Sequence, residues 1–175
     1  MFNELNQKIK ETNISFNKVS NQEKVVMLAQ DVLYRISIQN LIPKNGDILD
    51  IGPFFKYRKN KSIKSIINTE KCIVCAKGAL FCAYIGRVNK LKIGDYEEFN
   101  NYKDIVHQRL EELISLEQLD LIEIAFEGKS YLRICKNSDL IVTASNYFTT
   151  YVNPLTRLKA IMKNIISNNG VFKPI

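Results

Sequence analysis

The chain has 175 residues, of which 46% are hydrophobic and 25% are charged. These fractions are typical of one globular domain and exclude a chain that is disordered as a whole. The 25 Lys and Arg residues outnumber the 18 Asp and Glu residues, which gives a net charge of +7 and a pI of about 9.2. This balance favours an anionic partner, although a solvated lysine-rich surface explains it equally well.

The N-terminal residues 1–14 lack the apolar stretch of a signal peptide. The longest apolar run, residues 73–85, contains Lys77 and is too short to cross a bilayer. We therefore expect a cytosolic protein that does not enter a membrane, with its four cysteines reduced.

The N-terminal part of the chain predicts one long helix and one short strand. Residues 1–20 are expected to form a loosely attached helix before them. Ser20 with Glu23 is a capping-box pattern, and the apolar residues behind it recur at helical spacing, so we expect a helix over residues 22–40. A turn at Asn45-Gly46 then leads to a strand candidate over residues 47–51.

Residues 70–87 hold three of the four cysteines and few polar side chains. Small residues recur there at helical spacing, so we expect a buried central helix that begins after an N-cap at Thr69. The predicted core around it includes Cys75, Ala76, Ala79, Cys82, Ala83, Phe126, Ile161 and Ile165.

The C-terminal half predicts three more helices. One is expected over residues 105–114, and a second over residues 116–127, between a capping box at Ser115 and Gln118 and a terminal Gly128. Residues 131–135 and 140–144 indicate a small hairpin, followed by a loop over residues 145–151. Asn153-Pro154 is typical of the start of a last helix.

Together these patterns predict an α+β fold that is predominantly α. We expect residues 1–175 to form a single compact domain, with about five helices and a short strand or hairpin around the central helix 70–87.

The cysteines and carboxylates are open to two interpretations each. A zinc site would need all four of Cys72, Cys75, Cys82 and Cys135, whereas their apolar neighbours favour buried packing. His107 with Glu111, and Asp120 with Glu123 and Glu127, have the helical spacing of ligand or acid–base pairs, although we expect both faces to be solvated. Because no phosphate-binding loop or nucleophile motif is present, we expect no cofactor and favour a protein that is not an enzyme.

Basic residues interleaved with aromatic ones are the best signal for an anionic ligand. Such residues neutralise phosphates and stack on unpaired bases, but a solvated basic segment has the same composition. The candidate nucleic-acid-binding or anion-binding residues are Lys56, Arg58, Lys59, Lys61 and Lys64, together with Arg157, Lys159 and Lys163 of the last helix.

Three segments carry a family resemblance. They read C-x-x-C-A-x-G-A-L-F from Cys72, Q-L-x-x-I-E-x-A-F-E-G from Gln118, and R-L-x-x-I-M-x-N-I-I-x-N-x-G-x-F-x-P from Arg157. In order and spacing they resemble small, uncharacterised proteins of tailed bacteriophages and prophages, from about Cys72 to the end of the chain. The resemblance implies an accessory protein made in the host cytosol, and it carries over no catalytic residue.

Three functions are therefore open. The first is a non-catalytic phage accessory protein that binds a host factor or an anionic signal ligand, for example to inhibit a host defence. The second is a basic nucleic-acid-binding module. The third is a small enzyme or zinc protein that uses the cysteines or the carboxylates of residues 120–127.

Overall fold

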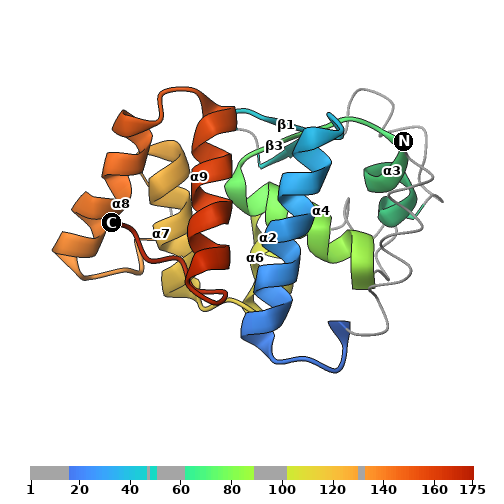
Figure 1. Cartoon of the computed structure of the whole chain (residues 1–175), viewed down its shortest axis with the longest axis horizontal. Helices are drawn as coiled ribbons and strands as arrows, with labels where there is room; N and C mark the ends of the chain where they lie inside the picture. The colour runs from blue at the N-terminus through green and yellow to red at the C-terminus, as the bar shows by residue number, and fades with distance from the viewer. Residues whose placement is uncertain (1–15, 47, 51–61, 89–101, 130–132) are drawn as a thin grey trace.

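The structure is a computed structural model that describes residues 16–46, 48–50, 62–88, 102–129 and 133–175 (Figure 1). Within these ranges the chain forms seven helices and one three-stranded sheet. The fold is therefore α+β and predominantly α, as the sequence predicts, although about five helices is too low a number. The helix predicted within residues 1–20 lies largely outside the described residues, which begin at Phe16.

Helix α2 (Asn21–Ser37) begins at the predicted capping box. The Glu23 carboxylate accepts the Ser20 N–H at 2.8 Å, and the Ser20 hydroxyl accepts the Glu23 N–H at 3.3 Å. The helix ends before the predicted residue 40, because Gln39 takes a left-handed conformation (φ 57°) and the chain turns into a strand.

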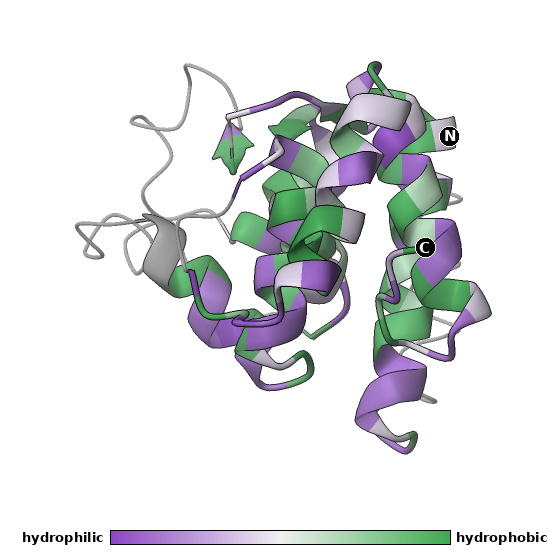
Figure 2. Ribbon diagram, turned by 90° about the vertical axis from the view of Figure 1, so that its left-hand side faces the viewer, coloured by the Kyte–Doolittle hydropathy of each residue, from purple (hydrophilic) through white to green (hydrophobic). Residues whose placement is uncertain are grey.

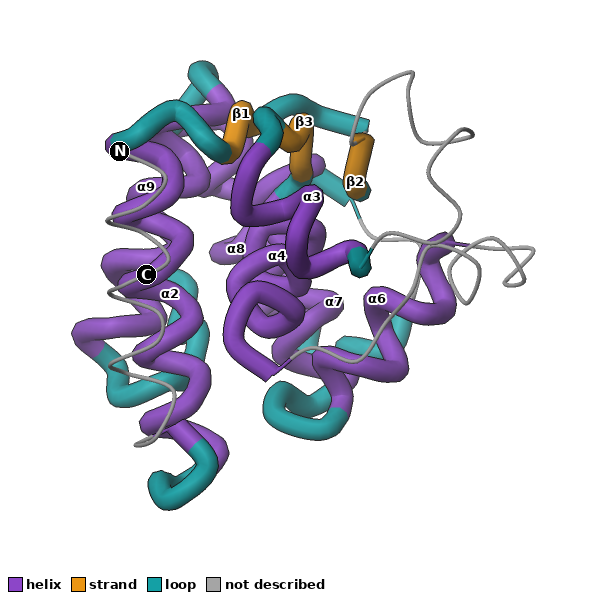
Figure 3. The backbone as a smooth tube through the Cα atoms, turned by 90° about the vertical axis from the view of Figure 1, so that its right-hand side faces the viewer, coloured by secondary structure: helices purple, strands orange, loops and turns teal. Residues whose placement is uncertain are grey.

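The sheet lies at one end of the helices, above α3 and α4 in Figure 3. Its central strand β3 (Cys72–Val74) is parallel to β1 (Leu41–Pro43) and antiparallel to β2 (Leu49–Asp50). The predicted strand over 47–51 thus contains β2. Pro43 offers no N–H at the outer edge of β1, which disfavours pairing with a further strand.

The predicted helix over 70–87 is wrong in its first six residues. Thr69 does not cap it but ends α3 (Ile63–Thr69), and its hydroxyl donates to the Ser65 carbonyl at 2.7 Å. Residues 72–74 pair with β1 instead, and the helix α4 begins at Ala76 and ends at Val88. The β-branched Ile73 and Val74 fit the strand, and the pairing partner is distant in sequence.

Helix α4 is nonetheless the central helix. It packs against α2, α3, α6 and α7, and every residue from 76 to 87 is buried. At Gly78 a Cβ atom would lie 1.5 Å from the Ile48 carbonyl oxygen, so the glycine permits the close approach of the β2 segment. The eight residues predicted for the core are all buried: Cys75, Ala76, Ala79, Cys82, Ala83, Phe126, Ile161 and Ile165.

The C-terminal half consists of α6 (Tyr102–Glu111), α7 (Leu116–Glu127), α8 (Ser138–Thr150) and α9 (Pro154–Ser167). Ser115 caps α7, the left-handed Gly128 ends it, and Asn153 caps α9, as predicted. The predicted hairpin and loop over 131–151 are wrong, because residues 138–150 form α8. Asn137 caps that helix by accepting the Asp139 and Leu140 N–H groups.

Helices α7, α8 and α9 lie together, and α2 packs along α9 on the opposite side from α8 (Figure 1). Figure 2 shows that the helices carry both hydrophobic and hydrophilic residues, and the buried hydrophobic residues form one cluster. None of the described helices combines the length and the apolar character needed to cross a bilayer.

Candidate functional site

A buried ionic cluster joins the three helices α4, α6 and α7. Lys77 is 1% exposed, and its Nζ lies 2.8 Å from Glu123 Oε2 and 2.7 Å from His107 Nε2. A charged Lys77 donates both contacts, so His107 accepts through Nε2. The expectation of solvated faces is therefore wrong for His107 and Glu123, whereas Glu111 is exposed and does not join His107.

Asp120, also expected on a solvated face, is fully buried and binds the main chain just before α8. Its Oδ2 accepts the Ile134 N–H at 2.9 Å and the Cys135 N–H at 2.8 Å. Glu127 is half-buried and accepts the Gly46 N–H at 3.0 Å. Burial raises the pKa of Glu127 above its usual value.

The cysteines do not gather into one site. Cys72 Sγ lies 3.9 Å from the Glu70 carbonyl oxygen, whereas Cys135 lies beside Glu117, 3.6 Å from its Oε1. Burial raises the pKa of the Cys75 thiol to about 11. Among the described residues no three His, Cys, Asp or Glu side chains form a group that could hold a metal ion, so the predicted alternative of a four-cysteine zinc site is not formed.

Arg157 is predicted to bind an anion but is buried, with 1% of its surface exposed. Its Nε donates to the Tyr151 carbonyl at 2.8 Å, its Nη2 donates to the Val152 carbonyl at 2.9 Å, and its guanidinium lies 4.2 Å from the centre of the Phe148 ring. The prediction is therefore corrected: this guanidinium fixes the turn between α8 and α9 and is not available to a ligand.

The other predicted basic residues do not form one site. Lys56, Arg58, Lys59 and Lys61 lie outside the described residues. Lys64 on α3 donates to the Arg87 carbonyl at 3.3 Å, and burial lowers the pKa of its ammonium. Lys159 and Lys163 line a pocket.

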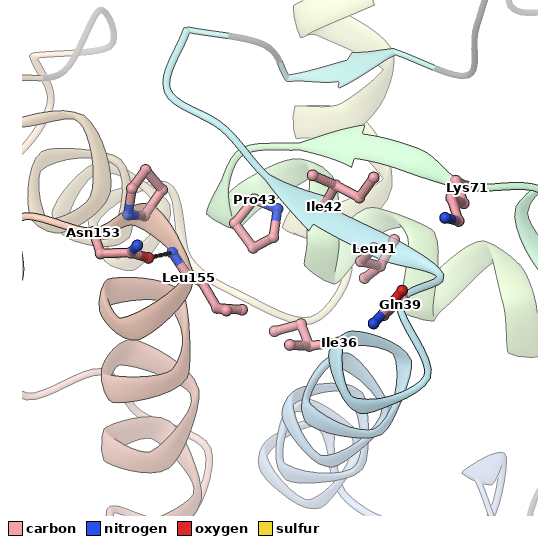
Figure 4. A pocket seen from close by; sticks show the side chains of 9 residues that line it. Ile36, Gln39, Leu41, Ile42, Pro43, Lys71, Asn153 and Leu155 are labelled. Carbon is pink, nitrogen blue, oxygen red and sulfur yellow. Dashed lines mark hydrogen bonds between the residues drawn. The ribbon is translucent and has the colours of Figure 1, made fainter.

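Three pockets lined by described residues are candidates for a ligand site. The first, of about 340 Å³, lies between β1 and the facing ends of α2 and α9 (Figure 4). We call it the β1 pocket, and Figure 4 shows Ile36 and Leu155 lying across it from each other. Its lining is mainly apolar, and Lys71 is its one charged residue. This pocket therefore offers little to bind an anion.

The second pocket, of about 300 Å³, lies between α7 and α8 beside Asp120 and Cys135. Lys129, Arg133 and Lys136 also line it. The Asp120 carboxylate already accepts two main-chain N–H groups there, and the Lys136 ammonium donates to the Arg133 carbonyl at 3.1 Å. The Asp120 carboxylate, the Lys136 ammonium and the Ser145 hydroxyl thus serve the local fold.

The third pocket, which we call the α8–α9 pocket, is the largest of the three at about 560 Å³. None of its lining side chains is acidic. Its lining combines two lysines, two tyrosines, polar residues of α9 and the last residue of the chain: Tyr147, Tyr151, Thr156, Lys159, Ala160, Lys163, Asn164, Ser167 and Ile175.

The two tyrosines of the α8–α9 pocket have different environments. Tyr147 is buried, its phenol accepts a hydrogen bond from Asn164 Nδ2 at 3.0 Å, and burial raises its pKa. Tyr151 is 37% exposed, and its ring centre lies 5.6 Å from that of Tyr147. Tyr151 is therefore the aromatic surface that a ligand can reach.

The two lysines of the pocket lie one helical turn apart on α9. Lys163 is exposed and Lys159 is partly exposed. In the part of the chain that the structure describes, neither ammonium forms an ion pair or hydrogen bond. Two adjacent cations with no acidic side chain among the other lining residues of the pocket make this face of α9 attractive to an anion.

Sequence reasoning found Lys159 and Lys163 but missed Tyr147 and Tyr151. The β-branched residues near the start of α8 favour a strand, which hides the helical spacing of the two tyrosines. The signal that identifies the helix is the N-cap Asn137, followed by apolar residues at intervals of three and four.

The chain has no significant match among protein-family models, curated proteins or solved structures.

Proposed function

We propose that this protein is a non-catalytic binding protein that holds a phosphate-bearing anion in the α8–α9 pocket. The observation that carries the proposal is the pair Lys159 and Lys163, two cations without partners in the described chain, beside the exposed ring of Tyr151. Ammonium groups neutralise phosphate oxygens, and an aromatic ring stacks on a planar base. A ligand with both features matches what the pocket offers.

The surrounding fold supports a binding role because the pocket is built on rigid elements. Its floor consists of two helices joined by a three-residue turn, residues 151–153, and Arg157 ties down the carbonyls of that turn. The Asn164 amide bonds both the N–H and the carbonyl of Lys173, which holds the C-terminal segment against α9. A preorganised pocket loses little conformational entropy when a ligand binds.

The wider role we propose is that of a phage accessory protein in the host cytosol. Its support is the resemblance of the three segments from Cys72, Gln118 and Arg157 to small proteins of tailed bacteriophages and prophages. Blocking a host defence by sequestering a nucleotide signal or a nucleic acid fits an anion-binding pocket. Affinity capture from host lysate, with and without nuclease treatment, tests this role by showing whether a reproducible partner is retained.

The test of the pocket is a titration followed by amide chemical shifts at low ionic strength, with adenosine triphosphate and octathymidylate as probes. Bound phosphate should shift amide signals of residues 156–167, and the double variant Lys159→Gln/Lys163→Gln should lose the effect. Lys71→Gln is the matched control, because it removes an equivalent exposed charge outside the pocket. The proposal is overturned if neither probe binds, or if the double variant binds as tightly as the parent chain.

A further inference from the structure

The polar groups of the α8–α9 pocket, apart from its lysines and Tyr151, are already used within the fold. Thr156 Oγ1 donates to the Asn153 carbonyl at 2.9 Å, and Ser167 Oγ donates to the Asn164 carbonyl at 3.1 Å. The Asn164 amide is likewise engaged, by Tyr147 and by the main chain of Lys173. Thr156, Ser167 and Asn164 therefore have no donor left to fix the orientation of a ligand.

This inventory decides between two kinds of phosphate ligand. A pocket that selects one small molecule places several convergent polar groups around it. A site that tracks a single strand needs cations for the backbone and an aromatic face for the bases, and it needs no directional contact to a base edge. Lys159, Lys163 and Tyr151 meet the second description and not the first.

The pocket is also longer than a single nucleotide needs. Its lining on α9 extends from Thr156 to Ser167, which at the helical rise corresponds to roughly 16 Å. Lys159 and Lys163 are separated by one turn, about 6 Å on the helix surface. This spacing suits successive phosphates of one strand.

Tyr151 lines the same pocket as the two lysines, and its main chain is held in place by hydrogen bonds. The Tyr151 carbonyl accepts from Arg157 Nε, and the Tyr151 N–H donates to the Tyr147 carbonyl at 2.9 Å. A base of a ligand held by the two lysines thus has an exposed aromatic ring within the same pocket.

We propose that the ligand is single-stranded nucleic acid, with its phosphates on Lys159 and Lys163 and a base stacked on Tyr151, bound without sequence preference. This inference rests on the proposed function, because it names the ligand class of the same pocket. Duplex DNA is expected to bind more weakly, since its bases are already stacked and cannot reach Tyr151.

The experiment measures fluorescence anisotropy of labelled octathymidylate, with unlabelled thymidine triphosphate and a duplex of equal length as competitors. The octamer should bind at least about 10-fold more tightly than either competitor. Tyr151→Leu should weaken octamer binding by roughly 5- to 100-fold, and Tyr151→Phe should preserve it. The double variant Lys159→Gln/Lys163→Gln should reduce the slope of log affinity against log salt by about 1.4. The control Lys71→Gln should leave this slope unchanged.

The outcomes separate this inference from the proposed function. If thymidine triphosphate or the duplex binds as tightly as the octamer, and the double variant abolishes that binding, the pocket binds anions but the single-strand inference is wrong. If Tyr151→Leu binds the octamer like the parent chain, stacking is refuted. If no probe binds, or if every probe ignores the double variant, both proposals fail.

Discussion

The buried contact between Lys77 and Glu123 permits a sharp test of the core. Lys77→Met keeps most of the length of the side chain but removes its charge, and it leaves the Glu123 carboxylate and the His107 ring without the ammonium between them. Both members of the ion pair are almost fully buried, with side-chain exposures of 1% and 6%. Water can therefore replace the lost ammonium only if the helices separate.

The expected cost follows from the geometry. At the observed 2.8 Å separation, Coulomb's law with an effective dielectric constant of about 20 gives an attraction of about 6 kcal/mol. Desolvation of both ions offsets part of this attraction, so the pair adds less to the stability of the fold. Removing one partner takes the counter-charge away from a buried carboxylate, and we expect Lys77→Met to lower the free energy of unfolding by about 3–5 kcal/mol.

Chemical denaturation followed by circular dichroism measures this change, with Lys71→Met as the control. Lys71 is exposed, so its replacement should change stability by less than about 0.5 kcal/mol. The double variant Lys77→Met/Glu123→Gln should recover roughly 2 kcal/mol relative to the sum of the single variants. A cost below about 1 kcal/mol for Lys77→Met, or strict additivity in the double variant, would refute the argument from the buried ion pair.

Three further predictions concern close packing, pH and thiols. Gly78→Ala should destabilise the fold by about 3 kcal/mol or more, because its Cβ would meet the Ile48 carbonyl, and a thermal unfolding midpoint equal to that of the parent would contradict this. Burial raises the pKa of Glu127, so its protonated form stabilises the fold below the unfolded pKa and this contribution is lost as the pH rises. Glu127→Gln, which can still accept the Gly46 N–H, should therefore raise stability at neutral pH and have little effect near pH 4, as pH-dependent denaturation would show. All four cysteines are buried, so a thiol reagent should react slowly with the native protein and fully after denaturation; one fast thiol in the native protein would argue against this burial.

The candidate site could be predicted only in part from the sequence. Lys159 and Lys163 could be named from the sequence because they are basic residues of the predicted last helix. Arg157 belongs to the same basic cluster in sequence, yet it turns inward to the carbonyls of Tyr151 and Val152. The choice between solvent and interior depends on what the α8–α9 turn offers, which no local pattern contains.

The sequence by itself determined where several helices begin and end, because caps act within a few residues. Ser20, Ser115, Gly128 and Asn153 each satisfy main-chain groups of their own helix, so their effect is readable locally. The burial of α4 was equally readable from its apolar composition.

Only the tertiary structure decided that residues 72–74 form a strand, because their partner at residues 41–43 is distant in the chain and competes with helix formation. It likewise decided that Lys77, Glu123 and Arg157 are buried, because a charge can leave water only where other elements supply its counter-charge or carbonyls. The pocket between α8 and α9 arises in the same way, from two helix faces that meet only when the chain has folded.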